Sequence, residues 1–413
     1  MSKEDILPKH WKVKKLGEVC FTTSGGTPNR GNKSFYEGNI PWVKSGELNK
    51  GLITKTEENI SEEAIKKLSA KVFPKGTLLI ALYGATIGKL AFLGVDAATN
   101  QAVCGIYKSE NIDSDYLYYY LFSKKPSLVK QGIGGAQPNI SQGILKNLEL
   151  PLPPLAEQQA IVLKIEELLS DLENGKQQLQ IAQQQLKIYR QSLLKWAFEG
   201  KLTNKNIKDD ELPNGWKLVT LGNVCYNVEY GSATKSKETG NVPVLRMGNI
   251  QKGIFDWSDL VFTDDDIEIK KYLLKKNDVL FNRTNSAEWV GKTAIYKGER
   301  PAIFAGYLIR INRIESLLNA DFLTYYLNTH AAKQYGNSVR SFGVNQSNIN
   351  GTKLKTYPIP LPPLTEQQLI VDELESKFTV CDKIEESISQ SLLQAESLRQ
   401  SILKKAFEGK LVK

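Results

Sequence analysis

The strongest constraint on this 413-residue sequence is an internal repeat that covers most of its length. The motif LPKHWK at residues 7–12 returns as LPNGWK at residues 212–217, and LPPLAEQQ at residues 152–159 returns as LPPLTEQQ at residues 361–368. The repeat distance is therefore 205 residues at the first motif and 209 residues at the second. The distance stays at 209 residues from the Pro-Pro motif to the FEGKL motif at residues 198–202 and 407–411. The changing distance before the Pro-Pro motif indicates loops on a globular domain, whereas the constant distance after it favours a helix whose register matters.

Both segments that follow the Pro-Pro motifs have the period of a paired helix. The first copy repeats apolar residues every seven positions at Ile165, Leu172, Leu179, Leu186 and Leu193, and a second set at Ile161, Leu168, Ala182 and Tyr189. The second copy has Leu374, Cys381, Ile388, Ala395 and Ile402, with a second set at Ile370, Ile384 and Leu398. Two such seams predict long helices that pack on each other as an antiparallel pair.

Two local signals refine this expectation. Asn174 and Gly175 fall on the first seam and predict a kink or an interruption of that helix. Thr365, followed three residues later by Gln368, predicts a capping box at the start of the second helix.

Each remaining segment mixes short β-like runs with one aromatic-rich helix. The runs lie at residues 77–82 and 278–281, and the helices at residues 116–122 and 322–327. The predicted fold class is α+β, with two α/β domains in tandem repeat separated by two long antiparallel helices that form a coiled coil. The expected boundaries are residues 1–150, a central helical spacer or dimerisation-like region at 151–204, a second domain at 205–358, and a C-terminal helical region at 359–413.

The net charge of +9 is concentrated in the two predicted domains. Residues 1–150 carry 20 basic and 14 acidic residues, and residues 205–358 carry 21 basic and 16 acidic residues. The segments 151–204 and 359–413 have net charges of 0 and −2. Basic domains suit a polyanionic partner, and a solubilising surface explains the same charge equally well.

Taken together, these motifs resemble the specificity subunits of Type I restriction-modification systems over essentially the whole chain. The resemblance lies in the two Leu-Pro-Pro-Leu motifs, the GGTP turn at residues 25–28, IPWVK at 40–44 with VPVLR at 242–246, NQ at 100–101, and the two FEGKL ends. It implies two target-recognition domains that each read half of a split DNA site. It also implies methyltransferase subunits, expected to be two, and restriction subunits as partners. The second copy departs from the pattern, because EYGS at residues 229–232 stands near the position of GGTP and nothing clearly matches NQ.

The candidate DNA contacts are polar and basic residues of predicted loops, since Arg reads guanine, Asn and Gln read adenine, and Lys holds phosphates. In the first domain they are Lys44, Glu47, Asn49, Tyr83, Thr86, Lys89, Asn100, Gln101, Gln137 and Asn139. In the second domain they are Arg246, Asn249, Gln251, Asn282, Arg283, Asn285, Lys292, Arg340, Asn345, Gln346 and Asn348. Ordinary turn structure explains any single one of these residues about as well.

The sequence predicts no catalytic residue, metal or cofactor. Its four cysteines form no CxxC pair, and only His10 and His330 accompany them. The GATIGKL run at residues 84–90 is one residue short of a P-loop and lacks the Ser or Thr that binds magnesium.

The expected function is that of a non-catalytic, DNA-binding specificity subunit in the cytoplasm, with double-stranded DNA as a partner and no membrane. A stand-alone DNA-binding regulator and a non-enzymatic coiled-coil scaffold are the alternatives. Two diverged domains in one chain speak against the symmetric regulator, and a scaffold needs no basic domains.

Overall fold

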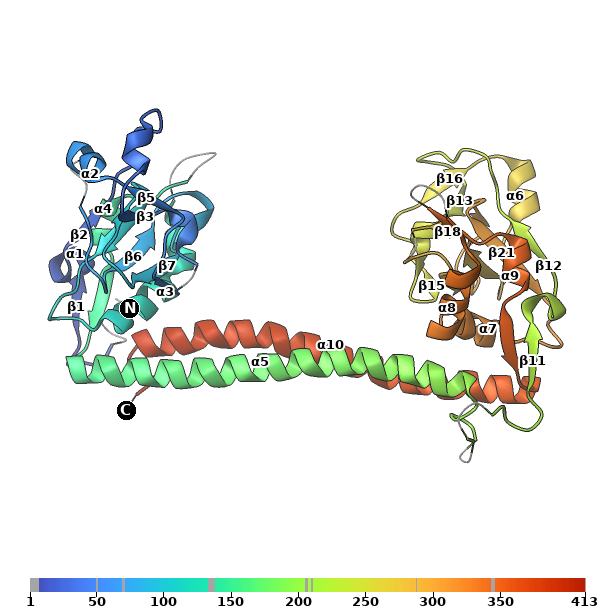
Figure 1. Ribbon diagram of the computed structural model, residues 1–413. Coiled ribbons are helices and arrows are strands. Elements are labelled where there is room, and N and C mark those ends of the chain that lie inside the picture. The colour runs from blue at the N-terminus through green and yellow to red at the C-terminus, as the bar shows by residue number, and fades with distance from the viewer. Residues whose placement is uncertain are drawn as a thin grey trace. The chain divides into compact units, whose positions relative to one another are not determined.

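The computed structural model describes residues 7–49, 51–68, 71–132, 138–204, 207–208, 211–286, 288–342 and 346–412. The chain forms two compact units, one made of Met1–Leu179 with Gln390–Lys413 and the other of Gln180–Ser389. We call them unit 1 and unit 2. Figure 1 shows that each contains strands, short helices and parts of the two long helices. The predicted fold class is confirmed: two mixed α/β domains in tandem with long antiparallel helices.

Unit 1 is built on a five-stranded sheet with the order β2-β9-β6-β7-β4. These strands are β2 (Thr22–Ser24), β9 (Val103–Ile106), β6 (Leu78–Ala81), β7 (Leu90–Leu93) and β4 (Gly51–Ile53). A second sheet joins β5 (Glu58–Ile60), β3 (Ile40–Val43) and β8 (Ala98–Thr99), and β1 (Lys12–Lys15) pairs with β10 (Glu149–Leu152). The helices are α1 (Leu16–Val19), α2 (Glu62–Leu68), α3 (Ser114–Gln131) and α4 (Gln142–Lys146), with 3-10 turns η2 (Lys33–Tyr36), η3 (Ser45–Glu47) and η4 (Gly84–Thr86).

Unit 2 repeats this plan with a main sheet of four strands. Its main sheet has the order β12-β21-β17-β19, formed by β12 (Cys225–Tyr230), β21 (Leu308–Arg313), β17 (Val279–Asn282) and β19 (Thr293–Ile295). Other sheets join β16 (Val261–Thr263), β13 (Val242–Leu245) and β20 (Ile303–Phe304); β18 (Thr284–Asn285), β23 (Ser347–Asn348) and β22 (Ser341–Phe342); β14 (Ile250–Gln251) and β15 (Ile254–Phe255); and β11 (Lys217–Thr220) and β24 (Pro358–Leu361). The helices are α6 (Asp266–Tyr272), α7 (Ala320–Leu327), α8 (His330–Val339) and α9 (Gly351–Lys355), with 3-10 turns η5 (Leu221–Asn223) and η6 (Met247–Asn249).

The central strands and the aromatic-rich helices form where the sequence predicts them. All four residues of β6 and all four of β17 are buried, as expected for apolar runs covered on both faces. α3 begins at its N-cap Asp113, whose carboxylate accepts hydrogen bonds from the backbone N–H groups of Asp115 and Tyr116. Asn319 caps α7 in the same way.

The two long helices are α5 (Leu155–Phe198) and α10 (Leu364–Phe407), each of 44 residues. They run antiparallel in unit 1. Glu173 of α5 forms an ion pair with Arg399 of α10, and Ile161, nearer the start of α5, shares a hydrophobic core with Phe407 at the end of α10. In unit 2, Arg190 bonds to Asp382. No helix in the described part of the chain is long and apolar enough to cross a membrane.

Only part of the predicted seam of α10 is covered. The five residues of its first set are at most 8% exposed, namely Leu374, Cys381, Ile388, Ala395 and Ile402. In its second set, Ile370 is buried, but Ile384 and Leu398 are 44% and 51% exposed. A pair of helices can bury only a narrow stripe, so apolar side chains beside that stripe remain at the surface.

The predicted interruption of α5 and the predicted capping box of α10 are wrong. α5 continues through Asn174 and Gly175 without an interruption, because packing of 44 residues outweighs the cost of one helical glycine, about 1 kcal/mol. α10 begins at Leu364, so Thr365 lies inside the helix, and the Gln368 side chain bonds to Asn319 and Asp372 instead of closing a capping box.

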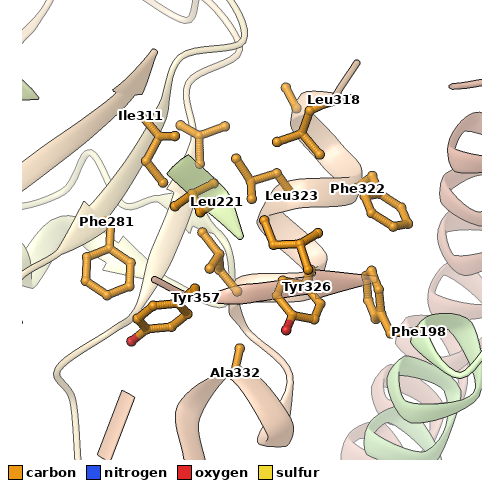
Figure 2. Close-up of a cluster of buried hydrophobic side chains, with 14 of the residues drawn as sticks. Phe198, Leu221, Phe281, Ile311, Leu318, Phe322, Leu323, Tyr326, Ala332 and Tyr357 are labelled. Carbon is orange, nitrogen blue, oxygen red and sulfur yellow. The ribbon is translucent and has the colours of Figure 1, made fainter. Parts of the chain in front are cut away.

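The end of a long helix anchors each α/β domain through an aromatic cluster. In unit 2 the ring of Phe198 lies 4.9 Å from that of Phe322 and 5.2 Å from that of Tyr326, both on α7 (Figure 2). In unit 1 Phe407 takes the same place, with its ring 5.2 Å from that of Tyr120 on α3. Each domain is therefore packed onto the repeated FEGKL motif.

Candidate nucleic-acid interface

Two loops of unit 1 that carry predicted contacts meet each other and the GGTP turn through backbone hydrogen bonds. The N–H of Asn100 donates to the carbonyl oxygen of Val43 at 3.0 Å, which joins the loop after β8 to the loop after β3. The N–H of Gly26 donates to the carbonyl oxygen of Thr99 at 2.9 Å and brings in the GGTP turn. Short polar loops at the ends of several buried strands form an adaptable surface on a rigid frame.

The loop after β6 joins the same group. The N–H of Leu82 donates to the carbonyl oxygen of Ala102 at 2.8 Å, and Tyr83 pairs with Asn139 in an isolated bridge. The GATIGKL run forms the 3-10 turn η4 and then enters strand β7, so it does not lead into the helix that a P-loop requires.

Gly25 of the GGTP turn is required because its backbone lies very close to that of Thr99. A Cβ atom at Gly25 would lie 1.9 Å from the carbonyl oxygen of Thr99. In unit 2, a Cβ atom at Gly231 would lie 2.2 Å from the carbonyl oxygen of Phe304. Gly231 is therefore the structural counterpart of Gly25, although the residues around it differ.

Most predicted contacts of unit 1 reach the surface. Asn49, Tyr83, Gln101 and Asn139 are exposed, and Lys44, Thr86, Lys89 and Asn100 are partly buried. Glu47 is only 5% exposed. Gln137 lies outside the described residues.

Lys44 is held by a network of carboxylates. Its Nζ atom lies 2.7 Å from a carboxylate oxygen of Glu57 and 3.0 Å from one of Glu58, and the Arg30 guanidinium reaches Glu58 at 2.6 Å. Hydrogen bonds from Arg30 and then Lys44 lower the pKa of Glu58. Hydrogen bonds to Glu57 and then Glu58 raise the pKa of Lys44. The buried Glu47 supports the loop, because its carboxylate accepts from the Lys44 N–H at 2.7 Å.

Unit 2 gathers its loops with corresponding backbone bonds. The N–H of Ala305 donates to the carbonyl oxygen of Leu245 at 2.9 Å, as Asn100 does to Val43 in unit 1. The N–H of Arg283 donates to the carbonyl oxygen of Tyr307 at 3.0 Å. The predicted loops after β13 and β17 therefore meet at one place.

Comparing these bonds shows what replaces the Asn100-Gln101 pair. Ala305 and Gly306 occupy its place in the backbone pattern, which explains why the second copy shows no sequence match. Arg283 takes the backbone place of the buried Leu82, and Tyr307 takes that of Ala102. Tyr307 is 52% exposed, so unit 2 presents a different chemical surface on the same frame.

Two basic positions are common to both units. Lys44 and Arg246 each follow the corresponding strands β3 and β13, and the Arg246 N–H donates to Asn249 at 2.8 Å as that of Lys44 does to Glu47. The carbonyl oxygens of Lys89 and Lys292 accept hydrogen bonds from β6 and β17 at 2.9 and 2.8 Å. These four cations therefore stand at matched places in the two units.

Aromatic rings support the cations of unit 2. The Lys292 Nζ atom lies 3.8 Å from the centroid of the Trp289 ring, and the Arg283 guanidinium lies 4.8 Å from that of Tyr230. Burial, and then the nearby charge of Lys333, lowers the pKa of Lys292. Two neighbouring cations form a favourable environment for a phosphate group.

The remaining predicted residues of unit 2 divide in the same manner. Gln251 and Gln346 are exposed, and Arg246, Arg283, Asn285, Lys292, Arg340 and Asn348 are partly buried. Asn249 and Asn282 are 3% and 0% exposed, and their amides bond to backbone carbonyls of their own unit. Asn345 lies outside the described residues.

Three exposed groups at these loops were not predicted. The guanidinium of Arg30 lies over the Tyr36 ring at 4.4 Å, and Trp289 and Tyr307 are 46% and 52% exposed. Trp289 lies in a connection two residues longer than its counterpart, because residues 283–290 replace residues 82–87 between matched backbone bonds. The change in repeat distance at this point was the signal that could have revealed it.

The described residues contain no group of three or more His, Cys, Asp or Glu side chains that could hold a metal ion. All four cysteines are buried and unpaired, and burial raises the pKa of Cys20 and Cys104 to about 11. The thiols of Cys20 and Cys104 are therefore protonated at neutral pH. The interface is suited to binding.

Comparison with known proteins agrees with this geometry. The family model of the Type I restriction modification DNA specificity domain matches residues 8–183 and again residues 213–394. The chain belongs to this family. The resemblance inferred from the repeated motifs is thereby confirmed, and the chain provides DNA sequence specificity in a restriction-modification system.

Individual members of the family are similar over almost the whole chain. The EcoKI specificity subunit of Escherichia coli K12 is 27% identical over 98% of this chain and 90% of its own length. The MjaIX specificity subunit of Methanocaldococcus jannaschii is 27% identical over 98% of this chain and 94% of its own length.

Solved structures share the fold. One chain from a study of complex assembly and conformational transition in the type I R-M system matches with a TM-score of 0.73 and 23% identity, covering 98% of this chain and 99% of that chain. The HsdS subunit from Thermoanaerobacter tengcongensis matches with a TM-score of 0.67 and 21% identity, covering 98% of each chain.

Proposed function

We propose that this chain reads a bipartite double-stranded DNA target, with one half read by the loops of each unit. The observation that carries the proposal is the pair of matched loop clusters, which share the cation positions Lys44/Arg246 and Lys89/Lys292. Shared cations suit the invariant phosphate backbone, whereas diverged side chains suit different bases. The exposed and partly buried members of the predicted contact set are the proposed base and phosphate contacts.

We propose that the chain is non-catalytic and acts in the cytoplasm with two methyltransferase subunits, one per repeat, and with restriction subunits through the complex. Large apolar residues on the long helices support a helix-packing partner. Leu163 and Ile188 on α5 are 68% and 66% exposed, and Leu369 and Leu393 on α10 are 60% and 74% exposed. Apolar side chains in such number favour burial by another protein.

A domain exchange tests modular reading. Residues 212–358 are replaced by the equivalent segment of a relative with a different target, and methylated adenines are mapped across host DNA. One half of the methylated motif is expected to change while the other half stays the same. A change in both halves, or in neither, would refute independent reading. Exchange of residues 7–150 is the matched control and should alter the opposite half.

A further inference from the structure

The cation that follows β3 or β13 is already engaged by a carboxylate in each unit. Lys44 lies within 3.0 Å of Glu57 and Glu58, and the Arg246 guanidinium lies 3.1 Å from a carboxylate oxygen of Asp259. Lys44 and Arg246 are two of the four cations at matched places. In each unit, one proposed phosphate contact is therefore paired with a carboxylate of the protein in the absence of DNA.

The carboxylates come from different places in the two strand pairs. Glu58 is the direct partner of Trp42 across β3 and β5, whereas the corresponding partner of Val244 across β13 and β16 is Val261. Asp259 stands two residues before Val261, where unit 1 has Thr56. The two carboxylates therefore occupy different positions in the repeat, although each forms an ion pair with the cation at the matched position.

The rest of the local geometry holds the cation in place for such a pair. Glu47 and Asn249 fix the backbone of Lys44 and Arg246 through hydrogen bonds of 2.7 and 2.8 Å. In unit 1, Arg30 also binds Glu58 at 2.6 Å and so holds that carboxylate beside Lys44. A side chain fixed at its backbone and paired at its tip must give up the pair to reach a phosphate.

This exchange affects cognate and non-cognate DNA differently. Binding without sequence preference rests almost entirely on phosphate neutralisation and counterion release. A cation that must first leave a carboxylate gains less from a phosphate, and base contacts can offset that loss only on the cognate sequence. Surface ion pairs contribute about 0–1 kcal/mol, so DNA can displace them.

We propose that Glu58 and Asp259 are specificity-determining residues, which lower affinity for non-cognate DNA by competing with phosphate for Lys44 and Arg246. The proposal rests on the DNA-reading function proposed above. It assigns to these acidic residues a contribution to specificity that requires no contact with a base.

The test uses the full chain assembled with its methyltransferase subunits and two fluorescent duplexes, one with the mapped target and one without it. Glu58→Gln and Asp259→Asn remove the charge and keep the shape. Each is expected to raise affinity for the non-target duplex about two- to fivefold. The slope of log affinity against log salt should steepen by about one in Asp259→Asn, because the variant removes the carboxylate that pairs with Arg246. It should steepen by less in Glu58→Gln, because Glu57 still lies 2.7 Å from the Lys44 Nζ atom. Affinity for the target should rise less, so the ratio of the two affinities falls.

Matched controls separate this effect from a change in net charge. Glu63→Gln removes a carboxylate of unit 1 that pairs with Lys67 at 3.1 Å on α2, and Asp266→Asn removes one from the first turn of α6. Neither should change the salt slope. In a Lys44→Met background, Glu58→Gln should no longer raise non-target affinity.

Three outcomes would overturn the proposal. They are unchanged non-target affinity and slope in both variants, equal rises in the controls, and a loss of target affinity alone, which would make the carboxylate a base contact. The Asp259 side chain is 88% exposed, so its replacement tests the idea even if Glu58→Gln disturbs folding. Failure of the unsubstituted complex to prefer its target duplex would instead refute the proposed function.

Discussion

The side-chain oxygen of Gln367 accepts a hydrogen bond from the backbone N–H of Asn319, the N-cap of α7, at 2.8 Å. The amide of Gln367 donates to the carbonyl oxygens of Pro362 and Leu317, each at 2.9 Å. In unit 1, Gln158 accepts from the N–H of Asp113 and donates to Pro153. Both glutamines are fully buried, so each repeated Glu-Gln-Gln motif pins the start of a long helix to the start of a domain helix.

Gln367→Leu should lower the free energy of unfolding of unit 2 by about 2–4 kcal/mol, because it leaves three backbone groups without their partner. Urea denaturation followed by circular dichroism measures the change. Gln368→Leu is the control, since that exposed side chain bonds to other side chains, and it should cost under about 1 kcal/mol. Equal costs would show that the buried position has no special role.

Gly25→Ala should disturb the loops of unit 1, because its Cβ atom would lie 1.9 Å from the Thr99 carbonyl oxygen. We expect a loss of stability of about 1–3 kcal/mol and weaker reading of one half-site. Gly46→Ala is the control in the same unit, since its Cβ atom would meet nothing within 4 Å. Thermal unfolding and methylation mapping measure the two effects, and a loss of the opposite half-site would contradict the assignment.

Lys292→Ala should weaken binding to all sequences alike and reduce the salt slope by about one, as expected for a phosphate contact. Burial, and then the nearby charge of Lys333, lowers the pKa of Lys292, and the two cations together favour an anion at this place. Binding should therefore also weaken on raising the pH before an ordinary lysine would lose its proton. Lys270→Ala on the exposed face of α6 should leave the slope unchanged. A loss confined to the target sequence would instead identify a base contact.

Arg340→Ala should reduce affinity for the target by about 1–3 kcal/mol and relax selectivity at one base pair, if the guanidinium reads guanine. Titration of duplexes substituted at each position of the mapped target measures the loss. A uniform loss over all duplexes, accompanied by a shallower salt slope, would reassign this arginine to a phosphate.

The sequence by itself determined the repeat, the two helical seams, the fold class and the family, because these follow from local spacing. A heptad period, a buried apolar run and a twice-written motif need no knowledge of distant contacts. The same spacing failed at Asn174 and Gly175, where packing along α5 overrides a local preference against helix.

Only the tertiary structure decided which side chains stand together. The partners of Lys44 and Arg246, the replacement of Leu82 by Arg283 at one backbone place, and the burial of Glu47 and Asn282 depend on strand register and loop closure. Register joins residues far apart in the chain, and a loop two residues longer shifts every position beyond it. The repeated motifs of the sequence therefore located the loops of the interface. Contacts between distant strands determined which charged side chains those loops present.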